Sequence, residues 1–582
     1  MTPRSFPASM QRALAASALT LSGCVFGAAL GCGSQVDTHA ADDGRDAGPA
    51  RDAAPAVRTC TAAVSFDPKS IVVAELRSTL PLSIPLLLAD GGDAVGDHPL
   101  KVVVLRDGVE VATLLDAPRA EALSATGSGL GALKVDFLAS TLTAPVPGRY
   151  ALRATLGCPK SATVATRATQ ETPLWILRLG AKSIGVGKGD GARIPLMYGA
   201  VDHAFKNYFA IPETLAATSL DTPAGEPELD TPAGVPRELP PLWTALDTPK
   251  VDKTGAVLET GSTLPVALKL GTRPDWVFTM GKTAAAADGS APVPSGIELA
   301  GLPKLRLVLD GATPTGDEGV LGVGAVTLRA AKSPVPAIAR ADVVLRWRFE
   351  AQSASGDWGA IPGATQHATF TVYGLLGNEQ GTTAPQLPWI AVVDEATKTI
   401  AGKATDALGA SSLLVQHINE EVGLTYDRAS GASAYSYPTG SDGWTGEVFA
   451  LSSFLKRTYG DVVNCSDCAS ILSTYSNMIG AKLRYCIIGF DFPLNPIEGI
   501  GATAFGSPFD SGRLGFSYHA VTSADASAHI YDATLAVDGD DDPKSAPHVR
   551  KMVQNMPGPE YLTRLSPGTP TYQYVDQATT VK

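Results

Sequence analysis

The 582-residue sequence is short of positive charge. It has 46 Lys and Arg residues against 58 Asp and Glu, a formal net charge of −12, and no segment concentrates the basic ones. This balance argues against nucleic acid as a partner. Histidine (eight residues) and cysteine (seven) are also few. Beyond Cys465 and Cys468, only Cys486 and scattered histidines could complete a zinc site, so the sequence gives no support for one.

One long apolar run, 13–30, follows Arg4 and Arg12. Basic residues before such a run are typical of a secretory signal, so we expect residues 1–32 to be a signal peptide. The sequences ending at Cys24 and Cys32 both resemble the bacterial lipobox, whose cysteine is lipidated and becomes the mature N-terminus. Cleavage at Cys24 would leave an exposed apolar tail, which favours Cys32, although Cys24 fits the first position of the motif better. The alternative is an ordinary signal peptide and a secreted protein.

Residues 33–58 are mainly Ala, Asp, Gly, Pro and Arg, with almost nothing to bury. Such a composition cannot offset the entropy of ordering, so we expect a flexible tether. The signal and the tether together predict a protein of the bacterial cell envelope, exported by the general secretory route. A lipid on the N-terminal cysteine would hold it in the outer membrane or at the cell surface.

Residues 59–168 show the alternation and turns of an all-β module. Val102–Leu105 runs into Asp107-Gly108 and then Val109–Val111, a short hairpin signal. Cys60 and Cys158 lie at the two ends of the segment, and in an oxidising compartment they can form a disulfide between its first and last strands. We therefore expect an immunoglobulin-like sandwich with a Cys60–Cys158 bridge; the alternative is two unrelated thiols.

A second β-rich module is expected over 172–380. Its clearest strands are 343–349, apolar at every second position, and 369–373. A Pro-rich insert that precedes both strands repeats Leu-Asp-Thr-Pro at Leu220, Leu229 and Leu246 and is low in complexity. Neither β module contains a motif that indicates chemistry, so both are interpreted as scaffolding.

The remaining segment, 384–582, predicts an α+β domain, with helices before an antiparallel sheet. Expected helices are 406–422, which ends at Gly423, then 446–459, and a third that begins at Cys465 after the N-cap Asn464. Expected strands are 483–490, 516–521 and 528–534. The predicted fold class is therefore multidomain, with two all-β modules followed by one α+β domain.

Cys465 stands at the first position of the third helix. There the positive end of the helix dipole and unpaired backbone N–H groups favour the thiolate, the form that attacks carbonyl carbons. The same N–H groups can stabilise an oxyanion. Cys465 is therefore a candidate nucleophile.

The pattern Cys465-Ser466-Asp467-Cys468-Ala469, then His519-Ala520, then Asp532-Ala533-Thr534 resembles the transglutaminase-like domain, which has a papain-like fold. The resemblance covers about a third of the chain. It implies a triad of Cys465 as nucleophile, His519 as base and later acid, and Asp532 as orienting carboxylate, with no cofactor. The chain departs from the family pattern after Asp532, where alanine replaces the usual proline.

The triad requires His519 and Asp532 to lie on one face of their hairpin. Pairing Thr522 with His529 would place them directly opposite one another, whereas pairing it with Ala528 would put them on opposite faces. We therefore predict the first register or one of the same parity. His529 is a second candidate for the base.

Other interpretations use the same residues. Cys465-Ser466-Asp467-Cys468 is also a Cys-x-x-Cys at a helix start, as in thiol–disulfide oxidoreductases, although no strand precedes it. Cys468 is expected to be buried or bridged to Cys486. The acidic run 538–542 lacks the spacing of a calcium loop and is interpreted as a solvated turn.

The function predicted is a cysteine acyl-transfer enzyme that acts on amide bonds of a peptide or protein, with cell-wall peptide as the candidate suggested by location. Hydrolysis and cross-linking both remain open. The alternative from a different class is a non-enzymatic surface adhesion or assembly protein that keeps the fold.

Overall fold

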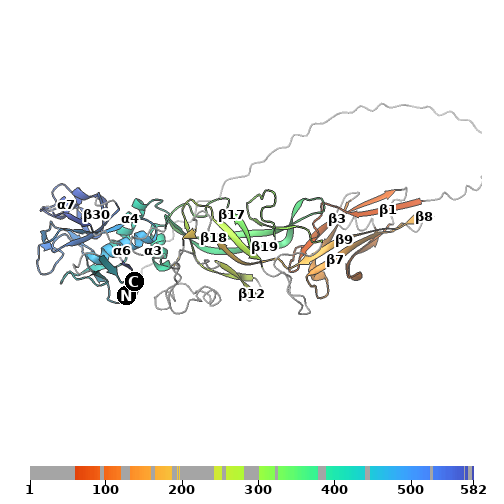
Figure 1. The fold of residues 1–582 in the computed structure, drawn as a ribbon, viewed down its shortest axis with the longest axis horizontal. Helices are drawn as coiled ribbons and strands as arrows, with labels where there is room; N and C mark the ends of the chain where they lie inside the picture. Colours follow the sequence, from red (N-terminus) through yellow and green to blue (C-terminus); the bar gives the residue numbers. More distant parts are fainter. Residues whose placement is uncertain are drawn as a thin grey trace, which may run out of the picture. The chain divides into compact units, whose positions relative to one another are not determined.

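The computed structural model describes residues 59–91, 98–118, 132–158, 164–186, 193–194, 196, 242–251, 257–280, 301–321, 325–377, 388–439, 446–524, 528–568, 570–574 and 580–581. The expected signal peptide, the lipidation candidates Cys24 and Cys32, the tether and nearly all of the Pro-rich insert lie outside these ranges. No helix in the described ranges is both long and apolar enough to cross a membrane. Strands are the main secondary structure, arranged in several sheets (Figure 1).

Two sheets form the first β module. One has the order β6 (Ala132–Phe137), β3 (Leu82–Gly91), β1 (Thr59–Phe66), β8 (Val164–Thr166). The other has the order β2 (Val73–Glu75), β9 (Ala168–Leu177), β7 (Gly148–Leu156), β4 (Pro99–Arg106), β5 (Val109–Pro118). Apolar residues of both sheets, such as Leu86 and Leu156, share one core, so the sheets pack face to face.

The predicted hairpin joins β4 and β5. Asp107 and Gly108 both have positive φ, at 53° and 80°, as the central residues of a type I′ turn require. Strand β9 pairs with β7 over nine positions, from Gly148–Ile176 to Leu156–Ala168. The sheet of the first module therefore continues to Leu177.

Cys158 is disulfide-bonded. It follows β7 and is partly buried against the core of the first module. Its expected partner, Cys60, lies in β1, but the Cys60 side chain is outside the described atoms. The Cys60–Cys158 pairing therefore stays a prediction.

The second β module also has two sheets. The first has the order β13 (Val257–Thr263), β12 (Trp243–Val251), β10 (Ala181–Val186), β15 (Asp275–Met280), β17 (Ala325–Arg329). The second has the order β11 (Arg193–Ile194), β14 (Val266–Lys269), β19 (Trp358–Leu375), β18 (Ala339–Gln352), β16 (Leu305–Leu309). The predicted strands 343–349 and 369–373 are parts of β18 and β19. Leu345, Trp347 and Phe349 are buried in β18 at every second position, as expected.

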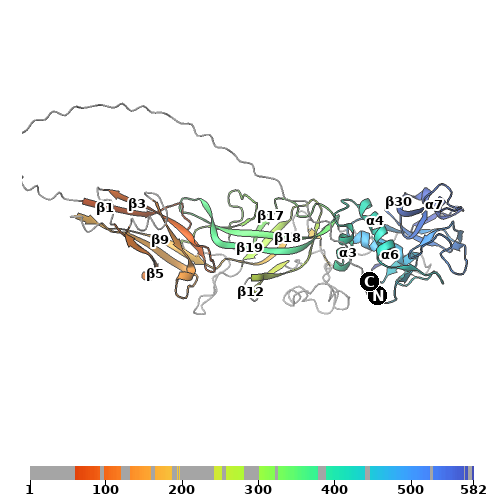
Figure 2. The same ribbon diagram turned by 180° about the vertical axis from the view of Figure 1, so that it is seen from behind.

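Helices precede the main sheet in the C-terminal part. They are α3 (Ile390–Ile400), α4 (Ala407–Gln416), the π-helical turn η4 (His417–Glu421), α5 (Leu451–Leu455) and α6 (Cys465–Met478), with α7 (Gly558–Leu565) later. The six-stranded sheet contains β26 (Glu498–Gly499), β29 (His529–Asp538), β28 (His519–Ser523), β24 (Arg484–Ile488), β31 (Tyr572–Tyr574) and β30 (Arg550–Pro557), which pairs with β29. Figure 2 shows α3, α4 and α6 grouped together, as their contacts require.

Short strands complete this part. They are β20 (Thr425–Tyr426) with β23 (Val462–Val463), β21 (Ser436–Thr439) with β22 (Gly446–Phe449) and β32 (Thr580–Val581), and β25 (Phe492–Pro493) with β27 (Gly515–Phe516).

The helix predicted over 446–459 is wrong. Its first four residues are the strand β22, which pairs with β21 and β32, and within 446–459 only Leu451–Leu455 is helical. Val448, Leu451 and Leu455 are three and four residues apart, which is the spacing of one helix face. The backbone of 446–449 nevertheless forms its hydrogen bonds with β21. Tertiary pairing has overridden the local pattern.

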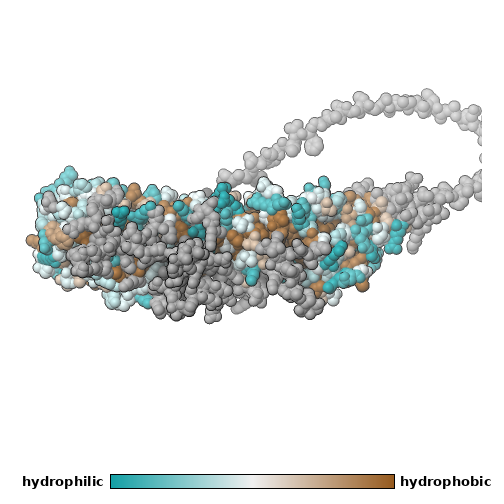
Figure 3. All heavy atoms as spheres, in the orientation of Figure 1, coloured by the Kyte–Doolittle hydropathy of each residue, from teal (hydrophilic) through white to brown (hydrophobic). Residues whose placement is uncertain are grey.

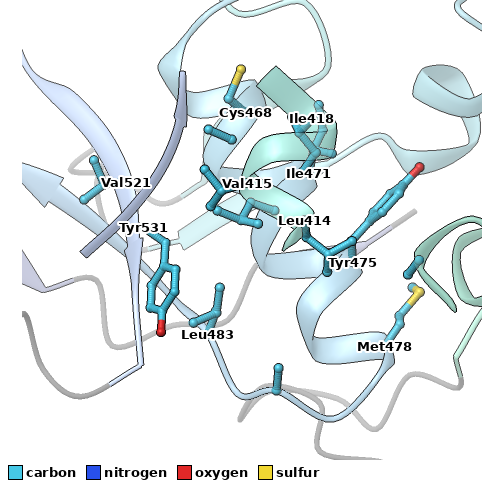
Figure 4. Close-up of a cluster of buried hydrophobic side chains, with 14 of the residues drawn as sticks. Leu414, Val415, Ile418, Cys468, Ile471, Tyr475, Met478, Leu483, Val521 and Tyr531 are labelled. Carbon is cyan, nitrogen blue, oxygen red and sulfur yellow. The ribbon is translucent and has the colours of Figure 1, made fainter. Parts of the chain in front are cut away.

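Helix α6 is buried on nearly all sides, since every residue except Asn477 is buried. Figure 4 shows Cys468, Ile471 and Tyr475 of α6 among side chains of α4, and Val521 and Tyr531 of the sheet. A helix enclosed in this way is part of the core of the C-terminal part. On the visible face of the molecule, polar and apolar residues are interspersed (Figure 3).

Candidate functional site

Cys465 is the first residue of α6, as predicted, and is 4% exposed. Asn464 caps the helix: its side chain accepts a hydrogen bond from Asp467 N (3.0 Å). In return, the Asp467 carboxylate accepts from Asn464 N (3.1 Å), which completes a capping box. The backbone on both sides of Cys465 is therefore fixed.

Asp467 has a second function that the sequence did not indicate. Its carboxylate also accepts from the backbone N–H groups of Ala434 (2.8 Å), Tyr435 (2.8 Å) and Ser436 (2.7 Å). Burial raises the pKa of Asp467, although the four N–H groups oppose that shift. The carboxylate thus attaches the segment that begins β21 to the helix that carries Cys465.

Strands β28 and β29 pair with Thr522 opposite Tyr531 and Ser523 opposite Ile530. This register is two residues from the one that pairs Thr522 with His529, and it has the same parity. His519 and Asp532 therefore share a face, as predicted.

His519 and Asp532 form a buried pair. His519 Nε2 lies 2.8 Å from Asp532 Oδ2, with the two side chains 0% and 1% exposed. The ring of Phe516 stacks on the His519 ring, with centroids 5.0 Å apart and planes at 9°. Asp532 Oδ1 accepts from the backbone N–H groups of Thr534 (2.7 Å) and Leu535 (3.3 Å). Carboxylate and stacked ring together fix the orientation of the imidazole.

The thiol of Cys465 lies near the same ring. Burial lowers the pKa of His519, but the charge and hydrogen bond of Asp532, with a smaller contribution from the Cys465 thiol, outweigh it and raise the pKa to about 10. Nδ1 of His519 has no hydrogen bond of standard geometry to any described residue. We therefore place the thiol close to the ring without a formed Sγ–Nδ1 hydrogen bond, since apo cysteine–histidine pairs are often loose.

Polar side chains also lie near Cys465. Ser466 Oγ and Tyr518 Oη are 3.0 Å apart. The pKa of Tyr518 is raised to about 12, mainly by burial, with contributions from Cys465 and Glu447, which are therefore its neighbours. Glu447 of β22 is 7% exposed, and its Oε1 has no hydrogen-bond partner among the described residues. Burial, and then the charge of Asp467, raise the pKa of Glu447 to about 8.

The predicted Cys468–Cys486 disulfide is wrong. Both thiols are free and buried, as is that of Cys465. Cys468 interacts with Thr534, and burial raises its pKa well above the ordinary value. Cys486 lies in β24 with Sγ directed at the Arg484 carbonyl (3.9 Å). Cys468 is thus a buried thiol, the other role expected for it.

His529 is not near the thiol. It begins β29, five residues before the position that the register places opposite His519. At about 3.3 Å per residue, it lies roughly 17 Å along the strand from that position. Distance therefore removes it as a candidate base.

Two supporting residues were missed. Tyr561 of α7 donates from Oη to Asp532 Oδ2 (2.6 Å). Asn419 of η4 donates from Nδ2 to the carbonyl of Ala533 (3.0 Å) and accepts from Arg550 Nη2 (2.9 Å). No local pattern identifies either residue, because each acts through a contact distant in sequence.

No group of three or more His, Cys, Asp or Glu side chains in the described ranges could hold a metal ion. In the acidic run 538–542, side chains of Asp538, Asp540 and Asp542 accept from backbone N–H groups of the same turn. Asp538 Oδ2 also contacts His548 Nδ1 (2.5 Å).

No protein family matches the chain, and no curated protein does. Solved structures match at low similarity. Three N-terminal domains of the Highly Immunogenic Outer Capsid protein of bacteriophage RB49 are 9% identical with a TM-score of 0.21, over 54% of this chain and 71% of that one. A tetra-tandem repeat from the extending region of a large adhesion protein is 9% identical with a TM-score of 0.15, over 54% and 74%. A bacterial ice-binding adhesin is 8% identical with a TM-score of 0.14, over 90% and 98%. Similarity at this level indicates no function, and none of the three is a transglutaminase-like protein.

Proposed function

We propose that residues 384–582 are a papain-like, transglutaminase-like domain that transfers acyl groups through Cys465, His519 and Asp532. The observation that carries this proposal is the buried His519–Asp532 pair, with Cys465 at a capped helix start near the same ring. A purely structural role for each residue taken separately does not explain why the three lie near one another.

The chemistry follows from the positions of the protons. His519 Nδ1 accepts the thiol proton, and the Cys465 sulfur bonds to the carbonyl carbon of an amide while the carbonyl electrons move to its oxygen. Backbone N–H groups at the start of α6 can stabilise that oxyanion. The C–N bond then breaks as the imidazolium returns the proton to the leaving amine, which leaves a thioester on Cys465.

The thioester is resolved by a second nucleophile. Water, or another amine, gives a proton to Nδ1 and attacks the thioester carbon, and the sulfur leaves as thiolate. Hydrolysis and cross-linking differ only in this nucleophile. The proposed substrate is a peptide or protein amide, with cell-wall peptide as the candidate given the envelope location that we propose from the N-terminal sequence.

Two other functions are the alternatives. A thiol–disulfide oxidoreductase would need a reactive second cysteine, and the buried, high-pKa thiol of Cys468 is unsuited to that role. A non-enzymatic surface adhesion or assembly protein is the stronger alternative, because two β-sandwich modules make up much of the described chain.

Labelling of the intact protein with an iodoacetamide probe across pH separates these functions. An enzyme should show one thiol, Cys465, that is labelled well below pH ~8.5, where an ordinary cysteine is mostly protonated. Cys465→Ala should abolish this labelling, and Cys468→Ala should not. If no thiol is labelled below that pH, the adhesion or assembly function is favoured.

A further inference from the structure

The carboxylate of Asp532 has four hydrogen-bond donors. Oδ1 accepts from the N–H groups of Thr534 and Leu535, and Oδ2 accepts from His519 Nε2 (2.8 Å) and Tyr561 Oη (2.6 Å). A carboxylate only accepts hydrogen bonds, so His519 carries its proton on Nε2 when neutral, and Nδ1 is left free to accept a proton. The imidazole and the phenol thus share one oxygen atom.

Tyr561 comes from a different element than the three proposed catalytic residues. It lies on α7, is fully buried, and contributes its ring to the hydrophobic core of the C-terminal part. Burial, and then the charge of Asp532, raise the pKa of its phenol well above the ordinary value, so it remains a donor at every physiological pH.

Sharing Oδ2 has an electrostatic consequence. A hydrogen bond from a neutral phenol draws negative charge off the oxygen that also faces His519, which weakens the attraction between the carboxylate and an imidazolium. A base held too strongly would keep its proton and would not return it to the leaving amine.

We propose that Tyr561 is a positioning residue of this site, which fixes the Asp532 carboxylate and moderates the proton affinity of His519. The inference deepens the proposed function and rests on it for its meaning in catalysis. The hydrogen bond and its effect on the ring do not depend on a reactive thiol.

The other titratable groups near the pair are few. Cys465 and Cys468 of α6 contribute from the helix side, the first to His519 and the second near Asp532. Tyr572 of β31 lies near Tyr561 and donates to the carbonyl of Gly558 (2.9 Å) at the start of α7. Replacing Cys465 removes the ionisable side chain that contributes most to the pKa of His519 after Asp532.

The test is an NMR titration of the full chain, labelled with ¹³C-histidine, in a Cys465→Ala background. His519→Gln identifies the His519 resonance by its loss. Adding Tyr561→Phe should raise the His519 titration midpoint by about one pH unit, a tenfold gain in proton affinity, while the ring still fills its place in the core. An unchanged or lowered midpoint overturns the proposal.

Tyr572→Phe is the matched control. It removes a phenol that donates to the same helix but not to Asp532, and should leave the midpoint where it is. Equal shifts in both variants would mean general loosening of α7 and would overturn the proposal. Because the readout needs no thiol, an inert Cys465 would contradict the proposed enzyme and leave this measurement intact.

Discussion

His519 and Asp532 are diagonal neighbours across β28 and β29, and their side chains nevertheless come within 2.8 Å. The register that pairs Thr522 with Tyr531 places Asp532 opposite Val521, two residues from His519. Diagonal neighbours on one sheet face are about 7–8 Å apart at the backbone, a gap that an imidazole and a carboxylate can span. The contact therefore requires that both residues lie on the same face of the sheet and that their side chains are long enough to span the diagonal. It does not require the two residues to be directly opposite one another.

Replacing each member of the proposed triad by alanine should reduce activity by a different factor. His519→Ala removes the base and should reduce amidase or acyl-transfer activity by roughly 10²–10⁴-fold, close to the loss in Cys465→Ala. Asp532→Ala should cost less, because it disturbs ring orientation and leaves Nδ1 in place. Single-turnover rates on a peptide amide would measure this order. Full activity in His519→Ala would contradict the mechanism.

Asp467→Asn should destabilise the C-terminal part by at least ~3 kcal/mol. An amide offers one oxygen where four backbone N–H groups now bond to two, so buried donors lose their partners. Urea denaturation gives the change in free energy of unfolding. Asp461→Asn is the control, since its exposed pair with Arg457 (3.2 Å) should contribute under about 1 kcal/mol.

Glu447→Gln should stabilise the protein at alkaline pH. The folded pKa of about 8 lies above the ordinary 4.5, so the unfolded chain loses its proton first as pH rises. The stability that this group contributes is fully present below pH ~4.5. It is lost progressively as the pH rises from ~4.5 to ~8, a total of about 2–4 kcal/mol. Glutamine keeps the shape of the neutral acid and does not titrate. Wild type and variant should unfold alike at pH 5 and diverge at pH 8.5; parallel curves would contradict the assignment.

Cys158→Ser should destabilise the first β module by about 4 kcal/mol if the bridge closes the loop from Cys60. The rest of the chain should unfold as before, because Cys158 packs against the core of that module. Mass spectrometry of unreduced peptides would identify the partner. Alkylation of both Cys60 and Cys158 without prior reduction would refute the predicted bridge.

Cys32→Ser should release the protein from membranes, since the polar segment that follows has nothing to insert. Fractionation of cells that express each variant measures this. If only Cys24→Ser releases the protein, the first lipobox is the one used, and release by neither replacement would contradict lipid anchoring.

Local signals predicted those elements whose ends are fixed by their own residues. The helix from 406 begins where Asp406 accepts from Gly409 N (2.8 Å), and α6 begins at the capping box around Asn464. Gly423 and Gly480 then follow with φ of 79° and 89°. Caps and glycines act within a few residues, so sequence alone is sufficient for them.

Elements that depend on distant partners were missed or misassigned. Residues 446–449 were expected to be helical from their apolar spacing. The prediction failed because the hydrogen bonds of this strand, β22, come from β21 and β32, the latter more than 130 residues away. Helix α3 was not predicted. In the candidate site, Cys465, His519 and Asp532 were proposed from resemblance and from their order in the sequence. Tyr561 and Asn419 were missed because they form hydrogen bonds to other elements, and no periodic sequence pattern marks such contacts.

The π-helical turn after α4 makes the position of Asn419 depend on the exact number of residues in that turn. Residues His417–Glu421 accommodate an extra residue per turn, and Asn419 within them bonds to the carbonyl directly after Asp532. A deletion of one residue there would restore α-helical winding and rotate the following side chains by about 100°. Asn419 would leave the Ala533 carbonyl, so this turn should not tolerate a deletion that an exposed loop would accept.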